Sequence, residues 1–198
     1  MKAYYESKGE TPPYTTLAGF RRASRVGNFS PAFKMWKNRN RDQKQYDEWV
    51  KKIGKGNMPE DVDKFVEIKY NNPKEYETLK IAVSDVEIRE KIGTNEYPIT
   101  IQSDKQGKHI QGHKNFIANR SYLAVSSVEE GQIFAAYLVR NYSGTGRIVR
   151  DKNGKWTHKE IIETKELIGF VKDTDGNWQP TKRATIHYAK DGTHIVPA

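Results

Sequence analysis

The chain contains no cysteine, which excludes disulfide bonds and thiolate metal sites. A cysteine-free chain suits a reducing compartment, and it equally suits a protein that unfolds and refolds in transit, so both remain open. The chain also lacks an apolar run of about eighteen residues, and no short apolar segment follows a basic start. We therefore expect no membrane span, no secretory signal peptide and no membrane partner.

Histidine is missing from residues 1–95, whereas all five histidines of the chain lie beyond residue 100. The first part instead shows helical patterns, with predicted helices at 59–70 and 73–92. A chain of 198 residues can form one large domain or two small ones. We predict a helical region over 1–95 and a second domain over 96–198.

Basic residues outnumber acidic ones, with a formal net charge of +9 and a pI near 9.5. Such a charge favours anionic partners, either nucleic acid or an acidic inhibitor protein. Between Arg21 and Lys44 the basic residues are interleaved with Phe29, Phe33 and Trp36, a pattern that can bind nucleic acid by phosphate contact and stacking. The alternative, which we favour for this segment, is a solvated basic face on irregular helices anchored by the aromatic rings.

The second part combines helix and strand signals. Ser127-Val-Glu-Glu130 forms a capping box, so we expect a helix to begin there and to end within 141–146. Turn signals at 151–154, 173–176 and 191–192 separate strand-like segments, residues 97–102 resemble a strand, and 105–113 resemble a basic loop punctuated by glycine. The predicted fold class is α+β: a helical N-terminal region followed by a C-terminal antiparallel meander packed against one or two helices.

Asp191-Gly192 predicts the turn of a C-terminal β-hairpin. In the register of a two-residue Asp-Gly loop, His187 and His194 share one face in a diagonal relation, with Cα atoms about 7–8 Å apart. The apolar side chains of the hairpin point to the opposite face, toward a core; they are Ile186, Tyr188 and Ile195. The hairpin therefore presents two imidazoles on one surface.

Several motifs of the second part occur together and in order: Lys105-Gln-Gly-Lys-His-Ile-x-Gly-His113, Tyr142-Ser-Gly-Thr-Gly146, Trp156 with Lys159-Glu160, Ile168-Gly-Phe170 and the tail from Lys182 to Ala198. In these motifs the chain resembles the polymorphic toxin type 50 domain, a family of predicted ribonucleases of the barnase/EndoU/colicin/RelE type. The resemblance implies an antiparallel sheet with helices on one side, metal-independent endoribonuclease activity, an RNA substrate and a cognate immunity protein. The family pattern has Pro where this chain has Gln111, and more often Asn where it has His158, which argues against a catalytic role for His158.

The first part resembles the C-terminal portion of minor head proteins of tailed phages. The resemblance rests on Thr11-Pro-Pro-Tyr-Thr-Thr-Leu-Ala-x-Phe-Arg-Arg-Ala23, Arg39-Asn-Arg-Asp42 and Phe65-x-x-Ile-Lys-Tyr-Asn71. It implies a toxin carried in a phage virion or made in the bacterial cytoplasm, acting in the cytoplasm of a target cell, with phage head or portal proteins as further partners. The sequence also permits an alternative: a structural minor head protein that binds portal, capsid or DNA and has no catalytic activity.

Histidine suits both proton-transfer roles of RNA cleavage because its ordinary pKa of about 6.5 lies near neutral pH. We predict catalytic roles, without assigning base or acid, for His109, His187 and His194, with His113 in support. One imidazole must be neutral and another protonated, so we expect a bell-shaped pH profile between about pH 5 and 8. We expect no cofactor and no metal, because His109 and His113 lie in a glycine loop rather than on one helix face.

Cations and backbone donors are expected to hold the phosphate. The candidates are Lys182, Arg183, Lys105, Lys108, Ser143 and Thr145, the last two through the hydroxyl and N–H groups of the Ser-Gly-Thr-Gly turn. An alternative for the four cations is that they are ordinary surface charges. An alternative for Ser143 and Thr145 is that they belong to a turn that only ends a helix. Glu160 fits a surface ion pair with Lys159 better than a general base. We expect a fragment from about Asn95 onward to keep the activity.

Overall fold

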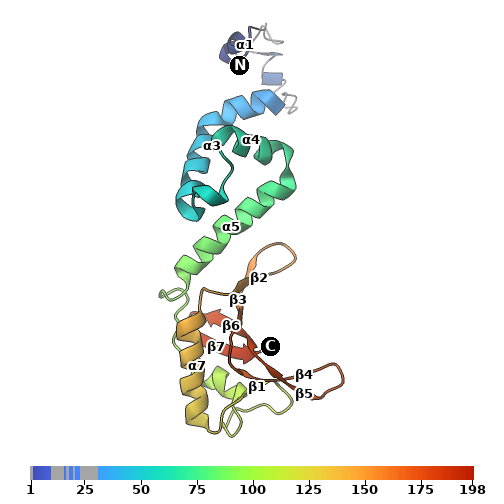
Figure 1. The fold of residues 1–198 in the computed structure, drawn as a ribbon. Coiled ribbons are helices and arrows are strands. Elements are labelled where there is room, and N and C mark those ends of the chain that lie inside the picture. The colour runs from blue at the N-terminus through green and yellow to red at the C-terminus, as the bar shows by residue number, and fades with distance from the viewer. Residues whose placement is uncertain (1, 10–15, 17, 20, 23–30) are drawn as a thin grey trace. The chain divides into compact units, whose positions relative to one another are not determined.

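The computed structural model describes residues 2–9, 16, 18–19, 21–22 and 31–198 (Figure 1). Most of the phage-like motif at 11–23, Phe29, and the side chains of Phe33 and Trp36 lie outside the described part. The chain divides into two compact units, Met1–Val86 and Glu87–Ala198. Each is described by itself below.

The N-terminal unit is helical, as predicted. Its described elements are α1 (Lys2–Ser7), α3 (Pro31–Ile53), the 3₁₀ turn η1 (Lys55–Asn57), α4 (Val62–Asn71) and the first part of α5 (Pro73–Lys91). The helices expected at 59–70 and 73–92 are confirmed as α4 and α5, whereas the basic segment after Pro31 forms one regular helix of 23 residues rather than irregular helices. Asp61 caps α4 by accepting a hydrogen bond from the Lys64 N–H.

Aromatic packing and one buried ion pair hold the N-terminal unit together. Phe65 is fully buried against the rings of Tyr46 and Trp49. The carboxylate of Asp42, also fully buried, accepts hydrogen bonds from Lys69 Nζ at 2.8 Å and from the Tyr70 hydroxyl at 3.0 Å. A buried carboxylate needs such partners, because an unpaired charge in the interior is costly.

The C-terminal unit is mixed, which confirms the α+β class. Its helical elements are the end of α5, α6 (Ser103–Gln106), η2 (Gly107–His109) and α7 (Val128–Tyr142); its strands are β1 (Tyr122–Leu123), β2 (Arg147–Arg150), β3 (Trp156–Glu163), β4 (Gly169–Lys172), β5 (Trp178–Thr181), β6 (Arg183–Ala189) and β7 (Gly192–Pro197). They form two antiparallel sheets of order β2-β3-β6-β7 and β1-β4-β5. The single meander expected from the turn signals is wrong, because the β4–β5 hairpin leaves the larger sheet and pairs with β1.

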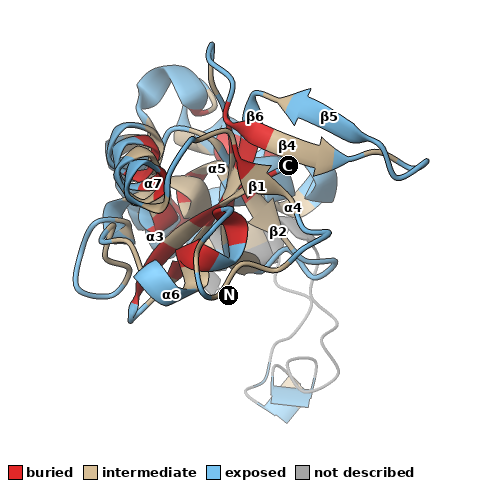
Figure 2. Ribbon diagram, turned by 90° about the horizontal axis from the view of Figure 1, so that it is seen from below, coloured by how far each residue is buried: buried red, intermediate tan, exposed pale blue. Residues whose placement is uncertain are grey.

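The core of this unit lies between α7 and one face of the larger sheet. Helix α7 begins at the predicted capping residue, Ser127, whose hydroxyl accepts from the Glu130 N–H. The buried cluster joins the inner side of the helix to the predicted apolar face of the hairpin; it includes Ala135, Leu138, Val139, Ile186, Tyr188 and Ile195. Figure 2 shows buried residues on α7 and β6. The assignment of the hairpin faces is therefore confirmed.

The register of the hairpin differs from the prediction. His187 lies directly opposite His194, and Ala189 lies opposite Gly192, so the two-residue loop is Lys190-Asp191. Gly192 belongs to β7 with a φ of 122°, and a Cβ on it would lie 2.9 Å from the Thr100 carbonyl oxygen. The glycine is thus needed for a close approach rather than for the turn. A slip of this kind keeps both histidines on one face, because side chains alternate with a period of two.

Two further expectations need correction. Residues 97–102 form no strand; Tyr97 and Ile101 make only isolated parallel bridges, to Ile92 and to Thr193 on β7 respectively. Residues 105–113 are not simply a loop, because α6 and η2 occupy most of the segment before a turn. In both places side-chain and backbone contacts to β7 decide the conformation, for example the hydrogen bonds of the Gln106 side chain to the backbone of Ile195.

Candidate active site

Three histidines from two distant segments gather in the C-terminal unit. The rings of His187 on β6 and His194 on β7 lie side by side, with centroids 4.6 Å apart. The ring of His109, from η2, stacks against His194 with centroids 6.2 Å apart and planes inclined by 15°. The tertiary structure therefore brings His109, about eighty residues away in sequence, to the pair that the hairpin presents.

His109 is held in one orientation. Its side chain is almost fully buried, and its Nδ1 lies 2.7 Å from the carbonyl oxygen of Ser121. A carbonyl oxygen can only accept a hydrogen bond, so Nδ1 carries the proton and Nε2 keeps its lone pair in the neutral ring. This arrangement suits a proton acceptor, because the second ring nitrogen is fixed by its partner.

Burial and mutual repulsion keep the histidines neutral. Desolvation is the main cause that lowers the pKa of His187 to about 4, followed by the charge of Lys159 and the presence of His109. Desolvation again comes first for His194, whose pKa falls to about 3, followed by the neighbouring His187 and His109. The pKa of His109 is also lowered, by burial that outweighs its hydrogen bond to Ser121. At neutral pH all three rings are therefore uncharged.

Lysines lie near the histidines. Lys159 on β3 lies directly opposite His187 in the sheet, so the two side chains share a face, and its charge contributes to the lowered pKa of His187. Lys108 acts electrostatically on both His109 and His194. A negatively charged phosphate at the three rings would therefore meet positive charge from more than one side.

The comparisons with known proteins bear on this unit. The family model described as Bacterial toxin 50 matches residues 101–197. The C-terminal part of the chain carries a polymorphic toxin domain. The match includes all three clustered histidines and both lysines beside them. A comparison with the curated proteins gives no match.

The other predicted cations of the toxin domain lie elsewhere or are engaged. Arg183 stands four residues from His187 on β6, about 13 Å along the strand, and its Nε lies 3.3 Å from Glu163. Lys182 precedes it, farther still from the histidine. Lys105 binds the exposed carboxylate of Asp191 at 2.7 Å, and its charge also lowers the pKa of His194. Lys182 and Arg183 thus lie away from the three histidines, whereas Lys159, which the sequence paired with Glu160 at the surface, lies beside His187.

His113 has a local role in the toxin domain. Its Nδ1 accepts a hydrogen bond from the Asn115 N–H at 3.0 Å, and its ring lies over Gly107 so closely that a Cβ there would be 2.2 Å from it. His113 therefore orders the turn that follows η2. These contacts shape the segment that carries His109.

The Ser-Gly-Thr-Gly turn binds an anion, but that anion is a carboxylate of the domain itself. Glu160 is fully buried and accepts hydrogen bonds from the N–H groups of Gly144, at 2.8 Å, and Gly146, and from the hydroxyl of Tyr188. The expected surface ion pair of Glu160 is therefore wrong. Burial and the bond to Glu160 raise the pKa of Tyr188 far above its ordinary value.

The two hydroxyl groups of this turn lie within it or below the surface. Thr145 Oγ1 donates to the Tyr142 carbonyl oxygen at 2.8 Å, and Ser143 Oγ is buried. The N–H donors of the turn are already bound to Glu160, which agrees with the alternative that the turn ends a helix. Ser143 and Thr145 thus lie in a turn whose N–H groups at Gly144 and Gly146 bind Glu160.

His158 is placed apart from the three histidines. Its ring packs against Tyr97 and Trp156, and its backbone has a positive φ of 58° in a bulge of β3. The positive φ explains why Asn would suit this position, because Asn adopts the left-handed region more readily than most residues. This supports using His158 as a control position.

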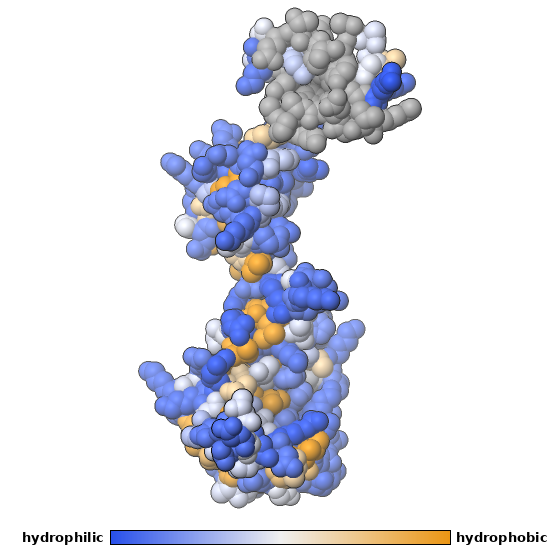
Figure 3. All heavy atoms as spheres, turned by 90° about the vertical axis from the view of Figure 1, so that its right-hand side faces the viewer, coloured by the Kyte–Doolittle hydropathy of each residue, from blue (hydrophilic) through white to orange (hydrophobic). Residues whose placement is uncertain are grey.

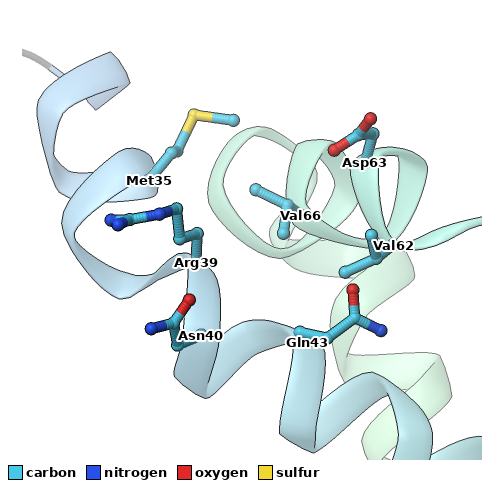
Figure 4. Close-up of a pocket in the computed structure, with 7 residues that line it drawn as sticks. All are labelled: Met35, Arg39, Asn40, Gln43, Val62, Asp63 and Val66. Atoms are coloured by element: carbon cyan, nitrogen blue, oxygen red, sulfur yellow. The ribbon is translucent and has the colours of Figure 1, made fainter. Parts of the chain in front are cut away.

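Among the described residues, no group of three or more histidine, cysteine or acidic side chains is placed to hold a metal ion. No helix in the same part of the chain is long and apolar enough to cross a membrane. A hollow of about 490 Å³ in the N-terminal unit lies between α3 and α4 (Figure 4); it is lined by Met35, Arg39, Asn40, Gln43, Val62, Asp63 and Val66. It contains no histidine, so it lacks the acid/base groups of the C-terminal site.

Proposed function

We propose that the chain is a phage-associated polymorphic toxin whose C-terminal domain cleaves RNA without a metal ion. The observation that carries this proposal is the meeting of His109, His187 and His194 beside Lys159 and Lys108. Adjacent imidazoles and cations are the groups that phosphodiester cleavage through the 2′-hydroxyl requires. The match of residues 101–197 to a toxin family supports a harmful activity for this same segment.

The proposed reaction needs two proton transfers. A neutral imidazole takes the proton of the 2′-hydroxyl, and the 2′-oxygen attacks phosphorus. The bond from phosphorus to the 5′-oxygen breaks, and an imidazolium donates its proton to that leaving oxygen. The products are a 2′,3′-cyclic phosphate and a free 5′-hydroxyl. His109 suits the role of base, because its Nδ1–H is held by Ser121 and its Nε2 keeps the lone pair that accepts the proton. The role of acid then falls to His187 or His194. The lysines stabilise the negative charge on the transferring phosphoryl group.

Binding of the phosphate itself is expected to create the acid. In the free protein the pKa values of His187 and His194 lie near 4 and 3, so little imidazolium exists at neutral pH. An anionic phosphate beside them favours the protonated ring and raises these pKa values. The profile of kcat/KM, which reports the free protein, should therefore peak on the acid side of the window of pH 5–8 expected from the sequence. The kcat profile, which reports the complex, should lie at higher pH.

Cleavage of RNA in the presence of EDTA tests the proposal. His187→Ala and His194→Ala should each lower the rate by about two to four orders of magnitude, the usual contribution of a positioned acid or base. His158→Ala is the matched control and should keep the wild-type rate. Persistent cleavage in both hairpin variants, or no cleavage by the wild type under any condition, would contradict histidine catalysis.

A role of the N-terminal unit in carrying the toxin rests only on the resemblance of its sequence to phage minor head proteins. The motif from Phe65 to Asn71 has a structural explanation of its own, since Phe65 and Ile68 are buried and Lys69 and Tyr70 bind Asp42. A structural head protein without activity remains the alternative. Incorporation of the chain into phage heads, without RNA cleavage, would favour it; release of cleavage activity from purified particles would favour the toxin. An inhibitor protein encoded beside it is a further expected partner.

A further inference from the structure

The outer face of the small sheet β1-β4-β5 carries a row of aromatic side chains. Tyr122 lies opposite Phe170, which lies opposite Pro180, and Lys172 lies opposite Trp178. Residues at alternate positions of paired strands share a face, so these five residues form one surface, called the aromatic face below.

This surface points away from the core. Leu123, the neighbour of Tyr122 on β1, is 1% exposed and belongs to the buried cluster, so the alternate residue Tyr122 faces the other way. Trp178 is 38% exposed although it is among the largest apolar side chains of the domain. In Figure 2, β5 is drawn as exposed and β1 and β4 as mainly intermediate. The surface drawn in Figure 3 is mainly hydrophilic.

The rings are arranged as a continuous group with a cation. Tyr122 lies 4.9 Å from Trp178 and 5.4 Å from Phe170, measured between ring centroids. The ammonium of Lys172 lies 5.1 Å from the centre of the Trp178 ring and donates to Asn119 Oδ1 at 2.9 Å. Aromatic rings beside a positive charge are the groups that hold single-stranded nucleic acid, by stacking on bases and by attraction of phosphates.

The aromatic face adjoins the histidine site through the backbone. Ser121, whose carbonyl oxygen holds His109 at 2.7 Å, is directly followed by Tyr122. Arg120, one residue before Ser121, acts electrostatically on His109. The short segment 120–122 therefore carries a cation, the group that orients His109 and one ring of the aromatic face.

We infer that the aromatic face binds unpaired bases of the RNA strand whose scissile phosphate lies at the histidines. This inference rests on the proposed function and names the substrate class: single-stranded RNA longer than the two nucleotides at the cleaved bond. A partner protein is a less suitable occupant, because the cations Lys172 and Arg120 and the link to His109 match a polyanion continuing from the histidine site. Stacking is sequence-tolerant, so little base preference is expected at this surface.

Steady-state cleavage of a dinucleotide and of an octanucleotide by the full chain tests this. Stacking of one base contributes about 1–3 kcal/mol, which corresponds to a change of about 5- to 150-fold in affinity. Trp178→Ala should therefore raise KM for the octanucleotide by about tenfold, with kcat little changed and the dinucleotide unaffected. Trp178→Phe should restore most of the affinity. Tyr137→Ala removes another exposed ring, 48% exposed on α7, and is the matched control with unchanged kinetics.

Binding measured without cleavage separates this inference from the proposed function. The double variant His187→Ala/His194→Ala, titrated with a 2′-deoxy octanucleotide, should show quenching of tryptophan fluorescence that Trp178→Phe reduces. Binding that depends on Trp178 without cleavage by the wild-type chain would support the aromatic face and remove the ribonuclease. Cleavage of the octanucleotide by a folded Trp178→Ala variant with wild-type KM would overturn the aromatic face and leave the ribonuclease intact. Loss of inhibitor binding alone in that variant would assign the surface to a protein partner instead.

Discussion

Removal of the Glu160 carboxylate should destabilise the C-terminal unit strongly. The carboxylate is fully buried and accepts three hydrogen bonds, from Gly144 N–H, Gly146 N–H and the Tyr188 hydroxyl. On the other side of the same turn, Arg89 donates to the carbonyl oxygens of Gly144 and Gly146 at 2.8 and 3.0 Å. The turn between α7 and β2 is thus held between a buried anion and a cation.

The size of the effect follows from these contacts. A hydrogen bond to a charged group contributes about 1.5–3 kcal/mol, and a buried donor left without a partner costs about 1–3 kcal/mol. Three such bonds set an upper range of about 5–9 kcal/mol, and entry of water and rotation of the Tyr188 hydroxyl recover part of it. We expect Glu160→Ala to lower the free energy of unfolding by about 4 kcal/mol, a large part of a typical domain stability of about 5–15 kcal/mol. Glu160→Gln should lower the free energy of unfolding by about 2 kcal/mol, because the amide N–H₂ of glutamine cannot accept a hydrogen bond from a backbone N–H group.

Amide hydrogen exchange in β3 and β6, followed by mass spectrometry, measures the opening of this unit separately from the N-terminal helices. Glu163→Ala is the control on the same strand. Its carboxylate pairs with Arg183 at the surface, with both side chains at least half exposed, so its loss should cost at most about 1 kcal/mol. Equal exchange in the two alanine variants would refute the role assigned to the buried carboxylate.

Two further predictions concern pH and length. Between pH 7 and 5 the free energy of unfolding should fall as the pH falls. In the unfolded chain His187 and His194 have an ordinary pKa of 6.5 and bind protons in this range, whereas in the folded chain their pKa values, about 4 and 3, keep them neutral. Urea unfolding of His187→Ala/His194→Ala should show a weaker dependence on pH, and a dependence equal to that of the wild type would contradict this reasoning. A fragment of residues 87–198 should fold and should melt near the temperature at which this unit melts in the full chain. A fragment of residues 95–198 should melt more than about 10 °C lower, because it lacks the two hydrogen bonds of Arg89. Equal melting temperatures of the two fragments in calorimetry would disprove the contribution of that arginine.

Local signals in the sequence predicted local elements well. Ser127 and Glu130 specified the start of α7 because capping satisfies backbone donors within a single turn. The alternation in β6 and β7 specified which face of the hairpin is buried, because side-chain direction depends only on position along a strand. For the same reason His187 and His194 lie on one face as predicted, although the predicted register of the hairpin was wrong.

Contacts between distant segments were outside the reach of such reasoning. The approach of Thr100 to Gly192 shifted the hairpin loop to Lys190-Asp191, although Asp-Gly is a strong turn signal. The pairing of β4 with β1 broke the expected meander, because strand partners are chosen by packing of the whole unit and not by their order in the chain.

The sequence by itself therefore determined the α+β class, the start of α7, the presence of α4 and α5, and the faces of the hairpin strands. Only the tertiary structure decided which groups meet: His109 with His194, Lys159 with His187, and the buried Glu160 with a turn that had suggested a phosphate site. The physical reason is that propensity, capping and alternation act over a few residues. Burial, pairing of strands and the depressed pKa values of the histidines depend instead on segments that only folding brings together.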